Sequence, residues 1–331
     1  MLIVISLLIL AISFFFILSQ GADLLLVNLK TLAEKTKIHP VLLGLMLGFL
    51  TTIPEFMVGL NSIRQGVASL SVGNIWGGII VILALILGLS IVLQREIKTD
   101  GRLSVVLPSF IFIIFSLFLG LKGYLNFYDG LLLLTFYLVI VYLDFLAGGH
   151  YRSDTLTQEA VLKAEGINKA KPWIGRRLYN FQRRYKVESI WAFIGLFLVI
   201  VSSYAIMEIA DIFLEIYPLP PFLVGLLIFS IGTNLPEIAV MIRSFKLKSG
   251  DISFGHLVGS AVSNILVLGL LSFMTKIEIN VSWRYYFLMM FMTFVLGTVA
   301  WFYVSEKKFD RREGLILIFL YLAFVAYESF L

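Results

Sequence analysis

Long apolar runs, separated by short polar stretches, follow one another along the whole of this sequence. They cover residues 2–30, 41–63, 71–94, 103–121, 127–147, 188–216, 220–243, 254–275, 282–304 and 313–330. Each run is close to the roughly 20 residues that a helix needs to cross the hydrocarbon core of a bilayer. Only 14% of the residues are charged, whereas a soluble domain carries about 25%. We therefore expect an all-α, multi-pass integral membrane protein with ten transmembrane helices.

Lysine and arginine gather in alternate connections between these runs. The connections after the first, third, fifth, seventh and ninth runs carry 22 of the 26 such residues. Cytoplasmic loops of membrane proteins are enriched in these residues, so the distribution predicts that these five connections lie inside and that both termini lie outside. We interpret residues 2–30 as a span and not a signal peptide, because the first basic residue is Lys30 and a signal peptide begins with a basic segment.

The longest connection, residues 148–187, carries nine basic and three acidic residues. We expect a solvated cytoplasmic loop, with contact to anionic lipid headgroups as a second interpretation. Nucleic acid is not an expected partner of a segment held next to a membrane. The sequence does not indicate an oligomeric state.

Two segments on either side of this loop are similar to each other at an offset of 182 residues. Thr51-Thr52-Ile53-Pro54-Glu55 corresponds to Thr233-Asn234-Leu235-Pro236-Glu237, and residues 51–82 share 8 identities with residues 233–264 without a gap. The chain therefore divides into a first five-helix repeat (1–147), the basic loop (148–187) and a second five-helix repeat (188–331). An odd number of spans in each half inverts the second half relative to the first. Secondary transporters are often built in this way, with the substrate site at the repeat interface near mid-membrane.

Glu55 and Glu237 lie near the middle of their predicted spans. A carboxylate at that depth is costly unless it is paired, solvated or bound to a metal ion. Each follows a proline, which removes an amide donor and frees backbone carbonyl oxygens of the preceding turn. Threonine hydroxyl and asparagine amide oxygens stand beside them. Because all these ligands are oxygens, we expect the pair to bind a hard cation such as Ca²⁺ or Na⁺.

These segments, each followed by a Gly-Asn/His-x-x-Gly sequence, resemble the two alpha repeats of the cation/calcium antiporter superfamily. The sodium/calcium exchanger branch in its short prokaryotic form is the most similar, over nearly the whole chain. The resemblance implies a secondary antiporter of a prokaryotic inner membrane that exchanges Ca²⁺ for Na⁺ by alternating access, with spans one and six sliding over the rest and no cofactor. It also implies a set of ion ligands: Glu55, Glu237, Thr51, Thr52, Thr233, Asn234, Ser260 and Asn264.

Some positions depart from the family pattern. The first repeat has Leu50 in place of a glycine, Gly78 in place of a serine ligand and Ile82 in place of an asparagine or aspartate. In the second repeat, Asn234 replaces a serine and His256 replaces an asparagine. The first repeat therefore lacks at least two oxygen ligands, which should weaken at least one ion site. A proton could replace Na⁺ as the driving ion in such a site.

Other interpretations stay open. One is an antiporter for another cation, and one is a membrane protein with the same ancestry that no longer transports. An enzyme is not expected, because the sequence contains no Walker motif, no Rossmann glycine run and no arrangement of a nucleophile with a base. The sequence has three histidines and no cysteine, which also disfavours a histidine-rich zinc site.

Overall fold

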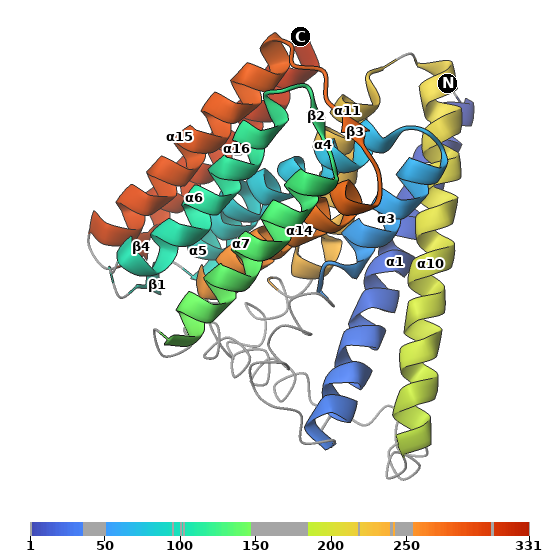
Figure 1. Cartoon of the computed structure of the whole chain (residues 1–331), viewed down its shortest axis with the longest axis horizontal. Helices are drawn as coiled ribbons and strands as arrows, with labels where there is room; N and C mark the ends of the chain where they lie inside the picture. The colour runs from blue at the N-terminus through green and yellow to red at the C-terminus, as the bar shows by residue number, and fades with distance from the viewer. Residues whose placement is uncertain are drawn as a thin grey trace.

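The computed structural model of the chain is almost entirely helical, as Figure 1 shows. It describes residues 2–35, 51–94, 96–99, 101, 103–146, 185–217, 219–238, 241, 254–305 and 308–330. The predicted span 41–63 is thus described only from residue 51, and the basic loop 148–187 only from residue 185. Position 50 and the end of the predicted span 220–243, apart from Met241, also lie outside the described residues. The described part of every predicted span is mainly helical.

The helices before the basic loop follow the apolar runs closely. They are α1 (Leu2–Lys35), α3 (Ile53–Arg64), α4 (Ala68–Ile80), α5 (Leu87–Gln94), α6 (Leu103–Gly120) and α7 (Phe127–Leu146). The π-helix η1 (Val81–Ile86) joins α4 to α5, so residues 68–94 form one continuous helical span. Pro54 stands in the first turn of α3, where the missing N–H of proline costs no helical hydrogen bond.

The helices after the loop show the proline break that the sequence predicts. α10 (Tyr185–Ile216) ends just before the segment 217–221, and α11 (Pro221–Val224) starts at its last proline. The π-helix η2 (Gly225–Phe229) and α12 (Ser230–Thr233) continue α11 without a gap. Three longer helices complete this part of the chain: α14 (Phe254–Met274), α15 (Trp283–Ser305) and α16 (Arg311–Phe330).

Six helices in the described part of the chain are long and apolar enough to cross a membrane. They include residues Ser6–Leu29, Ala68–Gln94, Val187–Ile216, Phe254–Met274, Trp283–Ser305 and Arg311–Phe330, and shorter apolar helices occupy Val106–Gly120, Phe127–Leu143 and Pro221–Thr233. On α15 the exposed indoles of Trp283 and Trp301 are separated by about 27 Å along the helix axis. This separation is close to the roughly 30 Å of a hydrocarbon core, and tryptophan is enriched at both membrane interfaces.

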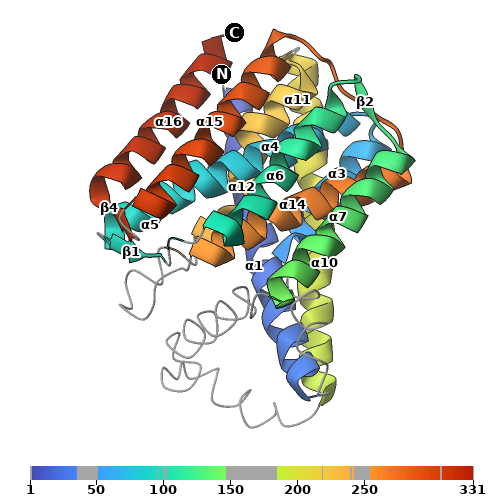
Figure 2. The ribbon, with the colours of Figure 1, turned by 60° about the vertical axis from the view of Figure 1, so that its left-hand side comes forward.

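The spans fall into a central and a peripheral set. In the apolar windows of the α4–α5 rod and of α14, 83% of the residues are buried, against 28–39% for α1, α10, α15 and α16. α1 and α10 lie side by side along their lengths and stand to one side of the other helices in both views (Figures 1 and 2). The core is therefore built around α4, η1 and α14, with the α1–α10 pair packed against its flank.

Two short strand pairs connect the first half of the chain to the second. β1 (Glu96–Lys98) pairs antiparallel with β4 (Lys308–Asp310), and β2 (Tyr124–Leu125) pairs antiparallel with β3 (Ile277–Glu278). The two pairs lie at opposite ends of the molecule (Figures 1 and 2). Glu96 of β1 and Glu278 of β3 are separated by the same 182 residues as the sequence repeat. Each half therefore supplies one strand to each end of the molecule.

Two close helix contacts at glycine residues also join one half of the chain to the other. A Cβ atom placed on Gly88 of α5 would lie 2.9 Å from the carbonyl oxygen of Gly314 of α16. A Cβ atom placed on Gly130 of α7 would lie 2.6 Å from the carbonyl oxygen of Gly269 of α14. Small residues allow membrane helices to approach this closely. The two contacts correspond to each other, because α5 and α14 occupy equivalent places in the two halves, as do α7 and α16.

The ends of the chain and the ends of the central connection lie on opposite sides. In Figure 1 the N- and C-terminal ends are both at the top of the molecule, while the last turn of α7 and the first turn of α10 point to the bottom. The order of the helices is therefore compatible with termini on one side of a membrane and the 148–187 connection on the other.

Candidate cation site

Thr52 and Asn234 have nearly the same non-helical backbone conformation, and each stands just before one of the two glutamates. Thr52, just before α3, has φ −99° and ψ 10°, and Asn234, just after α12, has φ −91° and ψ 13°. Helical structure resumes after both, since the amide of Phe56 donates to the Thr52 carbonyl and that of Ile238 to the Asn234 carbonyl. Each break is followed two residues later by a proline and three residues later by a glutamate. The breaks thus fix both glutamates in the first turn of a new helical segment.

The two glutamates are buried and interact with each other electrostatically. Glu55 is 2% exposed and Glu237 is 8% exposed, and their carboxyl groups are close enough to interact electrostatically. Oε2 of each has no hydrogen-bond partner in the described part of the chain. Two carboxylates in a low-dielectric interior repel strongly, so the pair needs a cation or protons between its oxygens.

Hydroxyl groups from the second half lie against both carboxyl groups. The Thr233 side chain faces Glu55, and its Oγ1 is 3.1 Å from Oδ1 of Asn74 and 3.1 Å from the carbonyl oxygen of Phe229. Oγ of Ser260, on α14, donates to Oε1 of Glu237 over 3.4 Å. The Ser260 hydroxyl thus orients the Glu237 carboxyl group, and both hydroxyls add oxygens that a hard cation can use.

Two amide groups meet at α4. Nδ2 of Asn234 and Nδ2 of Asn264 would both lie 3.0 Å from a Cβ atom placed on Gly78. Nδ2 of Asn234 donates to the carbonyl oxygen of Ser230 over 2.8 Å, while Oδ1 of Asn234 and Nδ2 of Asn264 have no partner within the described residues. Both asparagines are almost fully buried. The space that a side chain at position 78 would occupy is thus bordered by amides from the second half.

The structure therefore brings together most of the ligands that the sequence predicts. Glu55, Thr233 and Glu237 form one group, which Ser260 joins through its hydrogen bond, and Asn234 and Asn264 meet at Gly78. Thr52 is 1% exposed at the break before α3, and Thr51 is half-buried beside it. A ligand role for each of these residues stays a prediction.

One polar residue of this region, Asn74, was absent from the predicted ligand set. Its side chain is fully buried on α4 and accepts the Thr233 hydrogen bond, and its Nδ2 has no partner in the described part of the chain. The Gly73-Asn74 pair, repeated as Gly255-His256 in the second half, is the sequence signal that could have identified it. Asn74 thus connects α4 to the threonine that faces Glu55.

The chemistry of this group suits a small hard cation. The buried acceptor oxygens without a partner are Oε2 of Glu55, Oδ1 of Asn234 and Oε2 of Glu237, and burying such groups unsatisfied is costly. Carboxylate, amide and hydroxyl oxygens are the ligands that Ca²⁺ and Na⁺ prefer. Within the described residues no three histidine, cysteine or acidic side chains gather in one place, so the charge of this group rests mainly on the two glutamates.

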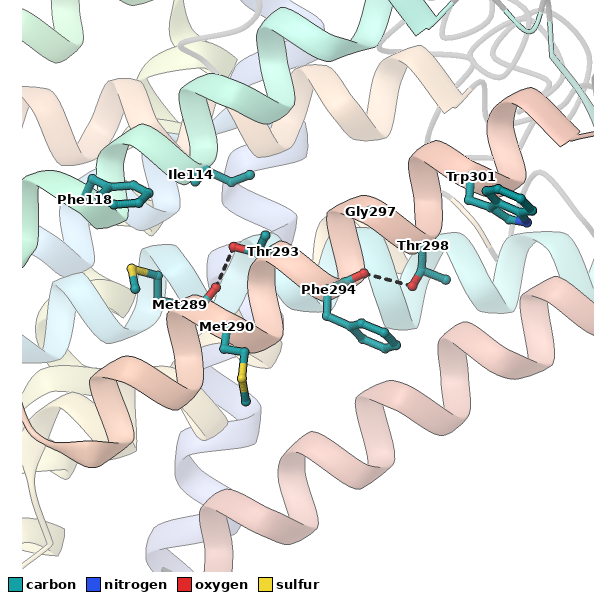
Figure 3. Close-up of a pocket in the computed structure, with 9 residues that line it drawn as sticks. All are labelled: Ile114, Phe118, Met289, Met290, Thr293, Phe294, Gly297, Thr298 and Trp301. Carbon is teal, nitrogen blue, oxygen red and sulfur yellow. Dashed lines mark hydrogen bonds between the residues drawn. The ribbon is translucent and has the colours of Figure 1, made fainter.

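A large apolar groove lies elsewhere, on the outer face of α6 and α15 (Figure 3). It has a volume of about 800 Å³ and is lined mainly by apolar side chains, including Phe118, Met290 and Trp301. The hydroxyls of Thr293 and Thr298 point back to the carbonyl oxygens of Met289 and Phe294 on their own helix, each over 2.8 Å. The residues that line this groove include no carboxylate, and none of them belongs to the group around Glu55 and Glu237.

Comparison with known families matches the chain in two segments. The family model described as sodium/calcium exchanger protein matches residues 6–146 and 188–330. The unmatched interval between them, residues 147–187, coincides with the basic loop to within one residue. The two matched segments correspond to the two halves that the sequence repeat defines.

Individual relatives cover most of the chain. The protein CaxA of Alkalimonas amylolytica is 26% identical over 328 residues, which cover 95% of each chain. The inner membrane protein YrbG of Escherichia coli K12 is 26% identical over 303 residues, which cover 85% of this chain and 84% of the relative. A solved structure of the sodium-calcium exchanger NCX_Mj, soaked with Na⁺ and Sr²⁺, has the same fold, with a TM-score of 0.61, 19% identity, and coverage of 96% of this chain and 98% of that chain.

Proposed function

Because the chain belongs to the sodium/calcium exchanger family, a family of membrane antiporters, we propose that it exchanges Ca²⁺ for Na⁺ across a prokaryotic inner membrane. The observation that carries this proposal is the buried pair Glu55 and Glu237, one from each half of the chain, which interact electrostatically and each have a carboxylate oxygen with no protein partner in the described structure. A cation between them would supply the interaction that both oxygens lack. The other proposed ligands are Thr51, Thr52, Thr233, Asn234, Ser260 and Asn264.

The proposed topology is ten spans in two inverted five-helix repeats (1–147 and 188–331), with both termini outside. Three relationships support it. The helix breaks at Thr52 and Asn234 correspond at the repeat offset. The strand pairs and the glycine contacts exchange elements between the halves. The basic residues gather in the connections that this topology places inside.

Alternating access would come from movement of the α1–α10 pair over the rest. This pair packs along the flank of the core (Figures 1 and 2). The ring of Phe15 on α1 lies edge-on to that of Phe229, with centroids 5.4 Å apart, and against Gly232. Gly232 precedes Thr233, so a shift of α1 would act directly on a segment that lines the site.

A transport assay tests the proposal. Purified protein is reconstituted in Na⁺-loaded liposomes, these are diluted into Na⁺-free buffer, and ⁴⁵Ca²⁺ entry is followed. We expect entry that needs the Na⁺ gradient and disappears in Glu55→Gln and Glu237→Gln. Glu278→Gln is the matched control, since the Glu278 side chain is 84% exposed and should not affect entry.

A second candidate, a cation/proton antiporter, is favoured by Gly78 and Ile82, which offer no side-chain oxygen where the second half has Ser260 and Asn264. Liposomes with a pH gradient and no Na⁺ distinguish the two. Entry under the pH gradient alone would establish this candidate. Correctly folded protein that shows no entry under either gradient would contradict both and favour a protein that no longer transports Ca²⁺.

A further inference from the structure

We propose that the buried hydrogen bond between Asn61 of α3 and Ser203 of α10 is a latch, which holds the α1–α10 pair in the position seen in the structure and must break in each exchange cycle. Nδ2 of Asn61 donates to Oγ of Ser203 over 3.0 Å, across 142 residues of sequence. The bond joins the two halves of the chain. This inference rests on the proposed antiport, to which it adds a positioning pair outside the ion ligands.

α1 and α10 are joined to each other at a pair of glycines. A Cβ atom placed on Gly195 of α10 would lie 2.7 Å from the carbonyl oxygen of Gly21 of α1, and one placed on Gly21 would lie 3.0 Å from the carbonyl oxygen of Gly195. Small residues at such a contact allow two membrane helices to pack backbone against backbone. Because the two helices also lie side by side along their lengths (Figures 1 and 2), we expect them to move as one body relative to α3.

An apolar cluster lies between this body and α3. Its buried side chains include Leu25 of α1, Val58 of α3 and Met207 of α10. Apolar contact is non-directional, so such surfaces slide past each other more easily than polar ones. A hydrogen bond weakens steeply when its geometry changes. The Asn61–Ser203 bond is therefore a contact that favours one position of α10 along α3 over the neighbouring positions.

A shift of α10 would leave the Asn61 amide without a new acceptor on that helix. Residues one turn away from Ser203 on the same face of α10 have no side-chain oxygen or nitrogen: Val199, Ile200, Ile206 and Met207. Asn61 is only 7% exposed and Ser203 is fully buried, so water has little access to either group. Since an unsatisfied buried N–H group is costly, the bond opposes the shift.

The latch is connected to the ion site through α3. Glu55 stands in the first turn of this 12-residue helix, and Asn61 follows six residues later, about 9 Å along the helix axis. Because α3 is short and uninterrupted, a displacement at Asn61 acts on the position of Glu55. A second hydrogen bond, from Nε2 of Gln65 after α3 to Oε1 of Glu208 on α10, spans 3.3 Å and is exposed. Water competes for that bond, so it holds α10 less firmly than the buried one.

A reversible cross-link tests whether the bond must break. The chain has no cysteine, so Hg²⁺ can bridge the two thiols of the double variant Asn61→Cys with Ser203→Cys in the full-length protein. In liposomes under the gradient, Na⁺ or pH, that drives uptake, Hg²⁺ should abolish ⁴⁵Ca²⁺ entry and excess thiol should restore it, while each single variant keeps its entry.

The control for this cross-link is Tyr124→Cys with Glu278→Cys, at paired positions of β2 and β3. This pair joins the two halves without involving α1 or α10, so its entry rate should not change when Hg²⁺ is added. Undiminished entry through protein cross-linked at positions 61 and 203 would overturn the proposal. An equal loss of entry in the control pair would overturn it as well.

A second measurement tests whether the bond sets the balance between the two access states. The Ca²⁺ concentration for half-maximal exchange is measured in right-side-out and in inside-out membrane vesicles, with Glu237→Gln vesicles as the background. Ser203→Ala should change the ratio of the two values about fivefold, the factor by which one buried hydrogen bond shifts a two-state equilibrium. Ser203→Thr keeps the hydroxyl and should keep the ratio of the unmodified protein.

The ratio separates a latch from a merely structural contact. A structural loss in Ser203→Ala would lower the maximal rate on both faces and leave the ratio unchanged, and that result would overturn the proposal. Absence of exchange in the unmodified protein under either driving gradient is a different outcome, because it contradicts the proposed antiport itself and this inference with it.

Discussion

Thr52 and Asn234 stand at corresponding places in the two halves and have nearly the same backbone angles, φ −99° and ψ 10° against φ −91° and ψ 13°. The side chains differ, so the correspondence belongs to the backbone. A break of this kind places the following carboxylate at the start of a helical segment, where backbone N–H groups and the helix dipole favour negative charge. Glu55 and Glu237 therefore occupy equivalent backbone positions, although the side chains next to them differ.

The first prediction concerns ion binding by the glutamate pair. Glu55→Gln and Glu237→Gln should each weaken equilibrium ⁴⁵Ca²⁺ binding to detergent-purified protein by about tenfold to a hundredfold, since each removes a charged ligand contribution of about 1.5–3 kcal/mol. Because Gln has nearly the same shape as Glu, both variants should keep the fold, which size-exclusion chromatography can check. Equal affinity in both variants and the unmodified protein would rule out the pair as the Ca²⁺ site.

The second prediction concerns the hydroxyl of Thr233, which faces Glu55 and lies 3.1 Å from Oδ1 of Asn74. Thr233→Ala removes this group and should reduce the initial rate of ⁴⁵Ca²⁺ uptake by about tenfold, because it leaves buried polar atoms without a partner. Thr233→Ser keeps the hydroxyl and should retain most of the rate. Thr293→Ala on the exposed face of α15, whose hydroxyl bonds only its own helix among the described contacts, serves as the control. A serine variant as slow as the alanine variant would contradict a role for the hydroxyl.

The third prediction concerns Gly78. A methyl group there would lie 3.0 Å from two amide nitrogens, so Asn234 and Asn264 would have to move by a few tenths of an ångström. Gly78→Ala should weaken Ca²⁺ binding several-fold while leaving the melting temperature of the protein in detergent nearly unchanged, since side chains and not backbone must move. Gly297→Ala is the matched control because no atom lies within 4 Å of its added methyl group. The same affinity in both variants would show that the amides do not border the ion.

Much of this fold could be predicted from the sequence, because each helix occupies an apolar run that can be recognised from its own residues. Apolar runs set the helices, and the prolines of 217–221 set the break between α10 and α11. The burial of Glu55 and Glu237 was also predictable, since each follows a proline within an apolar run. In each of these cases the physical cause lies within a few residues of the effect.

The parts of the site that depend on tertiary contacts could not be predicted in the same way. Asn74 joins the site because its side chain reaches from α4 to Thr233, which is 159 residues away in sequence. From the sequence, Gly78 could be interpreted only as a position that lacks an oxygen ligand. In the structure the amide nitrogens of Asn234 and Asn264 border that space, which follows from the packing of α4 against the second half.

The last prediction concerns an ion pair at the start of α7. Nζ of Lys122 lies 2.6 Å from Oδ1 of Asp129, and Oδ2 of Asp129 also accepts the backbone N–H of Asn126 over 2.8 Å. The Asp129 side chain is only 7% exposed, so removing its charge leaves a partly buried lysine without its partner. Asp129→Asn should lower stability by about 1–3 kcal/mol, seen as a lower melting temperature in detergent.

The neighbouring pair of Lys276 and Glu278 provides the comparison, because it involves the same sheet but faces solvent. Its atoms are 3.7 Å apart and its side chains are 56% and 84% exposed, and such pairs contribute about 0–1 kcal/mol. Glu278→Gln should therefore change the melting temperature little. If the two variants melted at the same temperature, burial would not be what makes the Lys122–Asp129 pair stabilising, and the start of α7 would have to be held by the strand pairing of β2 with β3 instead.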